Sequence, residues 1–432
     1  MRVIRALLLA IMLTVAPTAP PASADSPATS SQIALDWNLN AVNAVRAART
    51  MDGVAPGSTP RLLYQAEGLV YMSYVQAAEY DAVMKISHRY LLYHHFEAAA
   101  GHASVEAALV AAAYNTLVFY LGDSGGVLAA KYSSAIAALP ADEETMRGIS
   151  VGEAAAADIE QLRANDGRNS PVSDSCPRTT TAGVWQCAPP PSVQTEQTPW
   201  LATMQPFMLI DSSQFRAPAP PAIDSTQFLT ERDETRDLGA AASTVRTPDQ
   251  TSIATFWNAN AVSLYGKTLR DAAIQYNLDL VDTVRLMAAG IMVSTDAGIA
   301  CFDSKYHYRF WRPITAIRAD GEPADATWSP LLTTPNHPEY PAQHGCATSS
   351  FMQAIAATLG TNNFNLTIFG APVTGTALVP RVYGTPQQVD HDIQIARVAG
   401  GLHYRNSVVQ GQNLGHSVAT WTLDRFFLPG DD

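Results

Sequence analysis

The stretch LVDTVRLMAAGIMVSTDAGI, residues 280–299, is the clearest indication of the fold class of this chain. It is apolar nearly all the way round a helix, which is typical of a helix that is buried on every side. Apolar residues at helical spacing recur on both sides of it, and the alternation typical of strands is scarce. The sequence therefore predicts a central buried helix with other helices packed around it.

Helical periodicity predicts the remaining helices. The predicted segments are 63–84, 104–121, 127–139, 143–163, 233–242, 251–276, 278–303, 344–359, 386–398 and 404–427. Segments of this length pack as bundles, because each must bury an apolar face against a neighbour. We predict an all-α protein made of two packed helical bundles.

A proline-rich segment separates the two predicted bundles. Ten of the 28 prolines lie between Pro171 and Pro221, and proline ends helices because it lacks an amide and clashes with the preceding turn. The segment also holds the aromatic residues Trp185, Trp200, Phe207 and Phe215. Since flexible linkers are poor in aromatics, we predict an ordered loop. The expected boundaries are 25–167 for the first bundle, 168–230 for the connecting loop and 231–432 for the second bundle.

The composition is that of a globular protein, with 47% hydrophobic and 15% charged residues. The net charge of −12 repels nucleic acid and anionic lipid, so neither is an expected partner. An anion site in this chain requires basic residues that are concentrated locally.

The N-terminus has the pattern of a signal peptide. Arg2 and Arg5 precede an apolar run at 6–15, and Ala22-Ser23-Ala24 has the small residues that signal peptidase accepts. The apolar run is too short to span a bilayer. We expect cleavage after Ala24, export of the mature protein, and no membrane span.

The four cysteines are too few for a disulfide scaffold in a chain of 432 residues. Cys176 and Cys187 lie in the proline-rich loop and could close a local bridge, which the sequence leaves open. Cys301 and Cys346 are expected to be buried free thiols.

The first candidate binding segment is KYHYRFWRP, residues 305–313. Lys305 and Arg312 are seven positions apart, about two helical turns, so they could project from one helix face. Pro313 favours a helix end near Arg312. A lysine and an arginine together could hold a tetrahedral anion. Taken alone, the segment fits a solvated basic helix end somewhat better.

The second segment is PEYPAQHG, residues 338–345. Pro338 and Pro341 bracket a tight turn before an Ala/Ser-rich helix, which places His344 near the helix start. Backbone amides there could cradle an oxyanion, and His344 could shuttle a proton. An ordinary loop histidine is the alternative.

The third segment is RVAGGLH, residues 397–403. The glycine pair favours a break, so Arg397 and His403 could converge from the end of one helix and the start of the next. The positive end of that next helix would favour a bound anion. The alternative is a packing turn with a surface arginine.

In this order the three segments resemble the vanadium-dependent haloperoxidase and PAP2-type acid phosphatase superfamily. Its pattern is Lys-x6-Arg-Pro, then Pro-Ser-Gly-His, then Arg-x5-His. Further likeness to the bacterial haloperoxidase-like branch lies at 80–83, 163–167, 206–207 and 214–215. The resemblance covers residues from about 60 to 425 and implies a fold like that of vanadium chloroperoxidase.

The resemblance implies a role for each matching residue. His403 would be the single protein ligand of vanadium, or the phosphorylated nucleophile of a phosphatase. Lys305, Arg312 and Arg397 would hold the equatorial oxygens, and His344 would be the acid/base group. One pocket suits both chemistries, because vanadate and a pentavalent phosphoryl transition state share a shape.

This chain departs from the family pattern at Ala342-Gln343, where the family has Ser-Gly. A hydrogen bond to a charged group contributes roughly 1.5–3 kcal/mol, and Ala342 cannot make one. The backbone or side-chain amide of Gln343 could donate instead, so Gln343 is included among the expected oxyanion-binding residues.

Three functions follow as hypotheses. The first is peroxide-dependent halide oxidation to hypohalous acid, with vanadate as cofactor and Lys305 polarising the peroxide. The second is hydrolysis of phosphomonoesters through a phosphohistidine, without a cofactor. The third is an exported protein that binds oxyanions without turnover. The halide, the organic acceptor and the oligomeric state remain open.

Overall fold

The computed structural model describes residues 27–51, 59–170, 177, 179, 181–189, 196–320 and 325–430. The predicted signal peptide and Cys176 lie outside these ranges. Cys187 is disulfide-bonded, and Cys301 and Cys346 are buried free thiols, as predicted.

The described part of the chain is mainly helical, which confirms the predicted fold class. The first half contains α1 Pro27–Ala47, α2 Gln65–Ser87, α3 Val105–Leu121, α4 Val127–Ala137 and α5 Glu143–Leu162. The second half contains α6 Thr226–Gly239, α7 Pro248–Phe256, α8 Ala261–Gln275, α9 Leu280–Tyr308, α10 Pro313–Asp320, α11 Gln343–Leu359, α12 Pro386–Ala399 and α13 Arg405–Leu423. Two short antiparallel pairs join β1 Arg49–Thr50 to β2 Arg61–Leu62 and β3 Leu366–Gly370 to β4 Val379–Tyr383.

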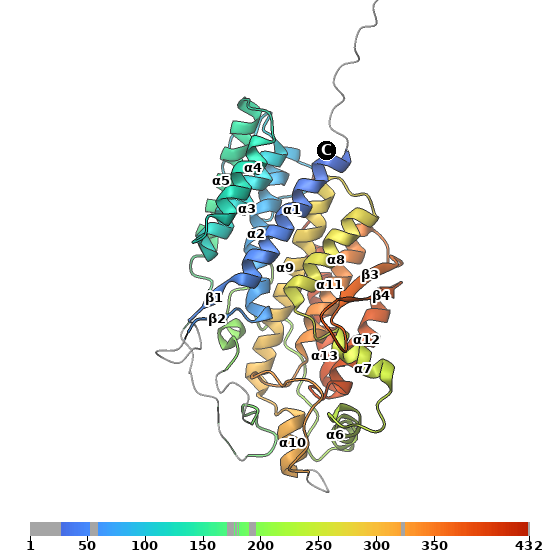
Figure 1. The fold of residues 1–432 in the computed structure, drawn as a ribbon. Coiled ribbons are helices and arrows are strands. Elements are labelled where there is room, and N and C mark those ends of the chain that lie inside the picture. Colours follow the sequence, from blue (N-terminus) through green and yellow to red (C-terminus); the bar gives the residue numbers. More distant parts are fainter. Residues whose placement is uncertain are drawn as a thin grey trace, which may run out of the picture.

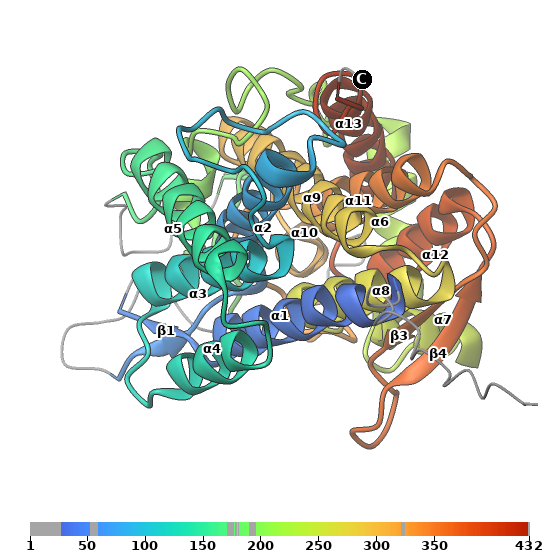
Figure 2. The ribbon, with the colours of Figure 1, turned by 90° about the horizontal axis from the view of Figure 1, so that it is seen from above.

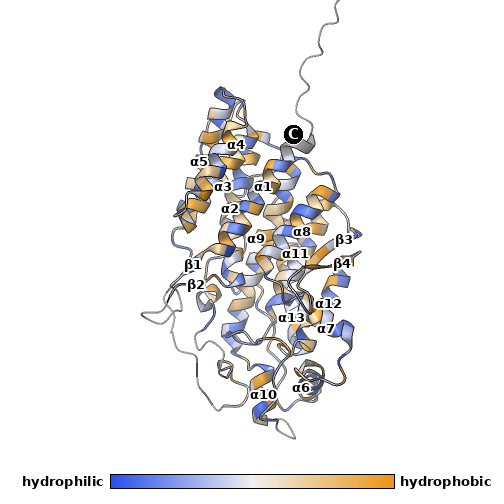
Figure 3. Cartoon of the chain, viewed as in Figure 1, coloured by the Kyte–Doolittle hydropathy of each residue, from blue (hydrophilic) through white to orange (hydrophobic). Residues whose placement is uncertain are grey.

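Helix α9 occupies the centre of the molecule, as predicted. It packs against α2 of the first half and against α11 and α13 of the second (Figures 1 and 2). Among the described residues it is the helix long and apolar enough to cross a membrane, yet 94% of its most apolar window is buried inside the protein. Figure 3 shows hydrophobic and hydrophilic residues mixed along the surrounding helices, as expected for helices with one buried face.

Several boundaries differ from the prediction. The segment predicted as one helix at 251–276 is two helices, because Asn260 caps the start of α8 through its side chain. Helix α9 ends at Tyr308, and α10 begins at Pro313, whose missing amide needs no partner in a first turn. Lys305 and Arg312 therefore do not share one helix face, which corrects that expectation.

The connecting segment is ordered in its described second part. The buried carboxylate of Asp296, on α9, accepts hydrogen bonds from the backbone amides of Phe207 and Met208 at 2.7 Å each and of Leu209 at 3.1 Å. Arg163 donates to the carbonyl of Pro206 at 2.9 Å. These bonds fix the segment against the central helix.

The helices that carry the site approach each other closely. A Cβ on Gly345 of α11 would lie 2.6 Å from the carbonyl oxygen of Val408 on α13. A Cβ on Gly411 would lie 2.6 Å from the carbonyl oxygen of Ala342. Glycine at both positions lets the starts of α11 and α13 meet.

Candidate oxyanion site

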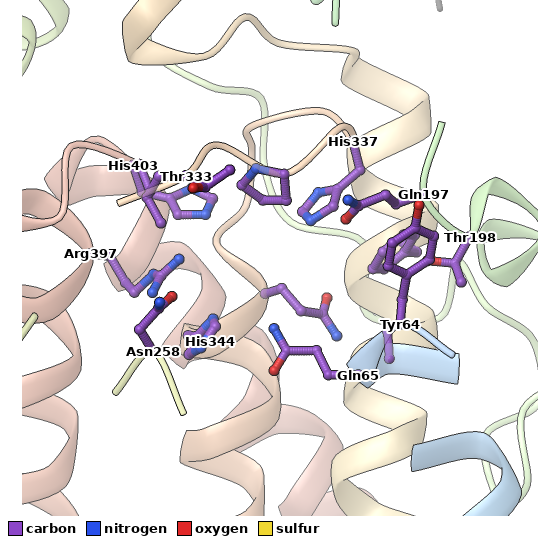
Figure 4. Close-up of a pocket in the computed structure, with 15 residues that line it drawn as sticks. Tyr64, Gln65, Gln197, Thr198, Asn258, Thr333, His337, His344, Arg397 and His403 are labelled. Atoms are coloured by element: carbon purple, nitrogen blue, oxygen red, sulfur yellow. The ribbon is translucent and has the colours of Figure 1, made fainter. Parts of the chain in front are cut away.

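A cavity of about 110 Å³ lies where the start of α11, the end of α12 and the turn before α13 meet. Its lining includes Gln343, His344, Arg397 and His403 from the predicted segments, and also His337. Figure 4 shows Arg397 and His344 together on one side, with His337 across the cavity. The structure thus brings residues of the second and third segments together.

His344 lies in the first turn of α11, as predicted. Its Nε2 is 3.1 Å from the carbonyl oxygen of Trp257. Because a carbonyl only accepts, Nε2 carries the proton and Nδ1 of the neutral ring is free of one. Burial, aided by the charge of Arg397, lowers the pKa of His344 well below its usual value. His344 is therefore a neutral base at neutral pH.

The turn between α12 and α13 places Arg397 and His403 at the same cavity. The carbonyl of Arg397 accepts from the amides of Leu402 at 3.1 Å and His403 at 3.3 Å, so the chain folds back on the helix end. Gly401 has a φ of 73°, a value that favours glycine. The predicted break at the glycine pair is confirmed.

Arg397 is a buried cation with unmet donors. It is 3% exposed, and its Nε and Nη1 have no hydrogen-bond partner among the described residues. Burial, together with the charge of Arg312, lowers its pKa to about 9, so it stays charged at neutral pH. Buried polar groups are normally hydrogen-bonded, so unmet guanidinium donors facing a cavity indicate a site for an anion.

His403 lies between the carboxylate of Glu339 and the guanidinium of Arg312. Its Nδ1 lies 2.8 Å from Oε1 of Glu339, and its Nε2 lies 3.1 Å from Nη1 of Arg312. Burial lowers the pKa of His403 well below its usual value, and the charges of Arg312 and Lys305 lower it further. The ring is therefore neutral at neutral pH.

Arg312 is buried beside the cavity, and most of its donors are already in use. Nε donates to the carbonyl of His337 and Nη1 to that of Leu402, both at 3.0 Å. Nη2 lies 3.0 Å from Nδ1 of His337. Burial lowers the pKa of Arg312 to about 10. With the contact of Nη1 to His403, four of the five guanidinium protons are in use, which leaves one on Nη2.

Lys305 differs from the expectation that it contacts the oxyanion. It is not among the residues that line the cavity. Its ammonium donates to the carbonyls of Pro338 at 3.0 Å, Glu339 at 2.9 Å and Pro341. An ammonium has three protons, and all three are used on the turn before α11. Burial lowers its pKa to about 8.

Sequence reasoning missed His337 and Glu339. Glu339 is fully buried, and burial raises the pKa of its carboxyl to about 7, although the charges of Arg312 and Lys305 oppose the rise. The missed signal was charge balance. Buried cations gathered by the predicted motifs need a buried acid, and Glu339 lies between the two prolines of the second segment.

Gln343 occupies the space that a glycine on the neighbouring helix leaves. A Cβ on Gly298 of α9 would lie 2.8 Å from Nε2 of Gln343. Its Oε1 is buried without a hydrogen-bond partner among the described residues. Ala342 is the N-cap of α11 and provides no side-chain cap. The expectation that Gln343 binds an oxyanion stays a prediction.

Comparison with known proteins agrees with this geometry. Residues 285–427 match the family model described as the VCPO second helical-bundle domain. Over these residues the chain is similar to the vanadium-dependent haloperoxidases. The matched range contains all three predicted segments, so the resemblance seen in the sequence is confirmed.

Individual haloperoxidases extend the comparison. Vanadium chloroperoxidase from Curvularia inaequalis is 28% identical over 144 residues, which make up 27% of this chain and only 24% of that protein. The crystal structure of the first bacterial vanadium-dependent iodoperoxidase has a TM-score of 0.75 at 21% identity and covers 92% of this chain and 97% of that one. A holo-type bacterial vanadium-dependent chloroperoxidase has a TM-score of 0.65 at 17% identity, with coverages of 88% and 96%. These structures share the fold.

Proposed function

We propose that this protein is a vanadate-dependent haloperoxidase that oxidises a halide with hydrogen peroxide to hypohalous acid. The observation that carries the proposal is the unmet guanidinium of Arg397, buried in a cavity with two neutral histidines, His344 and His403. The family match over the same segments supports it. We also propose that the protein is exported through residues 1–24.

The side chains present fit vanadate. The unmet Nε and Nη1 of Arg397 would bind its oxygens, Arg312 lies beside His403 to neutralise charge, and His403 would be the ligand. When bound, vanadate would supply the Lewis-acid centre that activates peroxide toward halide. The protein supplies the position, the charge and the exclusion of water.

His344 is proposed to move the proton. Halide oxidation converts hydrogen peroxide, halide and one proton to hypohalous acid and water, so a proton must be held and returned near the reacting atoms. The Nδ1 of His344 is the unprotonated nitrogen of a neutral ring at the cavity. It can take a proton from incoming peroxide and return it to the departing water.

Lys305 is proposed to act indirectly, by holding the turn that precedes α11. Its ammonium holds the carbonyls of Pro338, Glu339 and Pro341, so in this arrangement it contributes positive charge and a fixed turn. Direct polarisation of peroxide by Lys305 would require it to leave at least one of these carbonyls.

Phosphomonoester hydrolysis remains the second candidate, because one observation favours it. His403 is a neutral imidazole backed by the carboxylate of Glu339, an arrangement that suits a nucleophile. Its attack on phosphorus would release the alcohol, and Nδ1 of His344 would pass the proton of the substrate monoanion to the leaving oxygen. Water would then hydrolyse the phosphohistidine. This reaction needs no metal.

The deciding experiment uses residues 25–432, stripped of metal and then supplied with orthovanadate. Bromination of a dione with peroxide and bromide is followed at mildly acidic pH, and hydrolysis of an aryl phosphate is followed without vanadate. Vanadate-dependent bromination that is lost in His403→Ala and kept in His95→Ala, an exposed histidine, would support the haloperoxidase.

The other outcomes assign the protein differently. Phosphate release that vanadate inhibits, without bromination, would assign a phosphatase. Vanadate binding without phosphate release, and without oxidation of either bromide or iodide, would assign an oxyanion-binding protein. Full bromination by His403→Ala would overturn the proposed site.

A further inference from the structure

We propose that Glu339 is a positioning residue that holds His403 in the tautomer with its proton on Nδ1, so that Nε2 is the bonding atom. The use of Nε2 rests on the proposed function. The tautomer itself does not, because it is a property of the protein without any ligand.

The first constraint comes from the carboxylate. Oε1 of Glu339 lies 2.8 Å from Nδ1 of His403 and accepts from the backbone amide of Tyr404 at 3.1 Å. A backbone amide only donates, so Oε1 is an acceptor in this contact. An ionised carboxylate only accepts. With Glu339 ionised, Nδ1 of His403 must therefore carry the hydrogen that lies between the two atoms.

The second constraint comes from the opposite side of the ring. Nε2 of His403 lies 3.1 Å from Nη1 of Arg312. A guanidinium has donors and no acceptor, so Nε2 presents its lone pair. The other tautomer would place two acceptors together at Nδ1 and two donors together at Nε2. Both contacts therefore select the same tautomer.

The backbone of Glu339 is held as firmly as its carboxylate. Its amide donates to the carbonyl of Phe310 at 2.9 Å, and its own carbonyl accepts from Nζ of Lys305 at 2.9 Å. Residue 339 is fully buried. Lys305 thus acts on His403 indirectly, because it binds the backbone of the residue whose carboxylate contacts the ring. A carboxylate that accepts from one nitrogen of a metal-binding histidine fixes the orientation of its ring. It also makes the other nitrogen more basic, and so a stronger electron-pair donor to the metal.

A role in charge balance alone predicts a different result. Glu339 would then offset Arg312 and Lys305, and its loss would lower stability without changing the tautomer of His403. The protonation of the two ring nitrogens of His403 distinguishes the positioning role of Glu339 from a role in charge balance alone. Their 15N shifts distinguish a protonated from an unprotonated nitrogen, and they can be read in protein without ligand.

The test uses residues 25–432 labelled with 15N-histidine, with the His403 signals assigned by their loss in His403→Ala. In the unsubstituted protein we expect Nδ1 protonated and Nε2 unprotonated. Glu339→Ala should give a mixture of tautomers and bind orthovanadate about 10–100-fold more weakly, followed by 51V NMR. Glu339→Gln keeps an acceptor oxygen, so its tautomer population and its affinity for orthovanadate should be closer to those of the unsubstituted protein.

A matched control is Glu234→Gln, which removes a carboxylate that pairs with Arg405, two residues beyond His403. It should change neither the tautomer nor the affinity. The proposal is overturned if the unsubstituted protein carries its proton on Nε2, or if Glu339→Ala, folded by circular dichroism, leaves the tautomer unchanged. Vanadate binding that persists in His403→Ala would instead remove the proposed function and leave the tautomer result standing.

Discussion

Asp296 and Arg397 are two buried charges that the protein treats in opposite ways. Asp296 is fully buried on α9, and three backbone amides of residues 207–209 donate to its carboxylate. Arg397 is 3% exposed at the end of α12, and two of its nitrogens have no partner among the described residues. The first charge is satisfied by the chain itself, and the second has donors left for a ligand.

The charge state does not explain this difference. Burial raises the pKa of Asp296 to about 6, although its three amide bonds and Arg163 oppose the rise. Burial lowers the pKa of Arg397 to about 9. Both groups are mostly charged at pH 7.5, so only their partners differ. A buried charge with partners indicates a structural role, and a buried charge without them indicates a binding role.

The largest expected effect is on stability at Asp296. Asp296→Ala leaves three buried amides without an acceptor and should lower the free energy of unfolding by about 3–5 kcal/mol. Urea unfolding measures this loss. Asp211→Ala, an exposed acid of the same connecting segment, should change stability by less than about 1 kcal/mol. A loss below about 1 kcal/mol in Asp296→Ala would mean that Asp296 does not have the structural role inferred from its three amide partners.

Arg397 should show the reverse pattern. Arg397→Met removes the unmet donors and should weaken orthovanadate binding by about 100-fold, equivalent to about 2.7 kcal/mol. Stability should stay the same or rise, because an unpaired buried charge is replaced by an apolar side chain. Titration calorimetry and urea unfolding measure the two quantities. A fall in stability of more than about 2 kcal/mol would give Arg397 a structural role instead.

Sequence spacing predicted most of the site but not the direction in which its cations point. The Lys-x6-Arg, His344 and Arg-x5-His positions all lie at or beside the cavity. The ammonium of Lys305 nevertheless points to carbonyls of the turn that precedes His344. Those carbonyls are 33 or more positions away in the chain, and only the packed turn shows that they take its protons.

The sequence also predicted only part of the secondary structure. Periodicity predicted the central helix, because burial on every side leaves a signal within the helix itself. Periodicity did not predict α10, which begins at Pro313, or the hairpin of β3 and β4, whose strands are five residues each. In the sequence, Asp296 is one of several polar residues in this apolar stretch. Its partners at 207–209 are more than 80 positions away.

Glu79, on α2, is a buried acid that keeps its proton at neutral pH, and it therefore differs from both Asp296 and Arg397. Burial raises its pKa from 4.5 to about 8, opposed by a hydrogen bond from Gln76, and its Oε1 has no partner among the described residues. The folded protein therefore holds this proton more tightly than the unfolded chain. The resulting stability is complete below pH 4.5 and is lost as the pH rises through 8.

Glu79→Gln should remove this loss. The variant should be more stable than the unsubstituted protein at pH 9, by about 1–3 kcal/mol, and nearly equal to it at pH 5. Urea unfolding at both pH values gives the difference. Glu97→Gln, whose side chain is 94% exposed, should show no such pH dependence. An equal difference at pH 5 and pH 9 would mean that Glu79 does not titrate as its burial requires.

The smallest expected effect comes from a hydroxyl placed at Ala342, which precedes the cavity residue Gln343. Ala342 is the N-cap of α11 without a side-chain cap, so the hydroxyl of Ala342→Ser can accept from a first-turn amide and stabilise the protein by about 0.5–1 kcal/mol. The same hydroxyl can donate its hydrogen to an oxyanion, which should strengthen orthovanadate binding by about three- to tenfold. Urea unfolding and titration calorimetry measure the two gains.

The gain in binding should depend on Arg397. Both residues would donate to one small anion, so contacts that share a ligand are expected to be coupled rather than additive. In the double variant Ala342→Ser/Arg397→Met, the gain from the hydroxyl should shrink, because the anion is no longer held against the helix start. The gain in stability should persist, since the cap involves only α11. If both gains persist unchanged, Ala342 and Arg397 do not face the same anion, and the unmet donors of Arg397 belong to a different ligand.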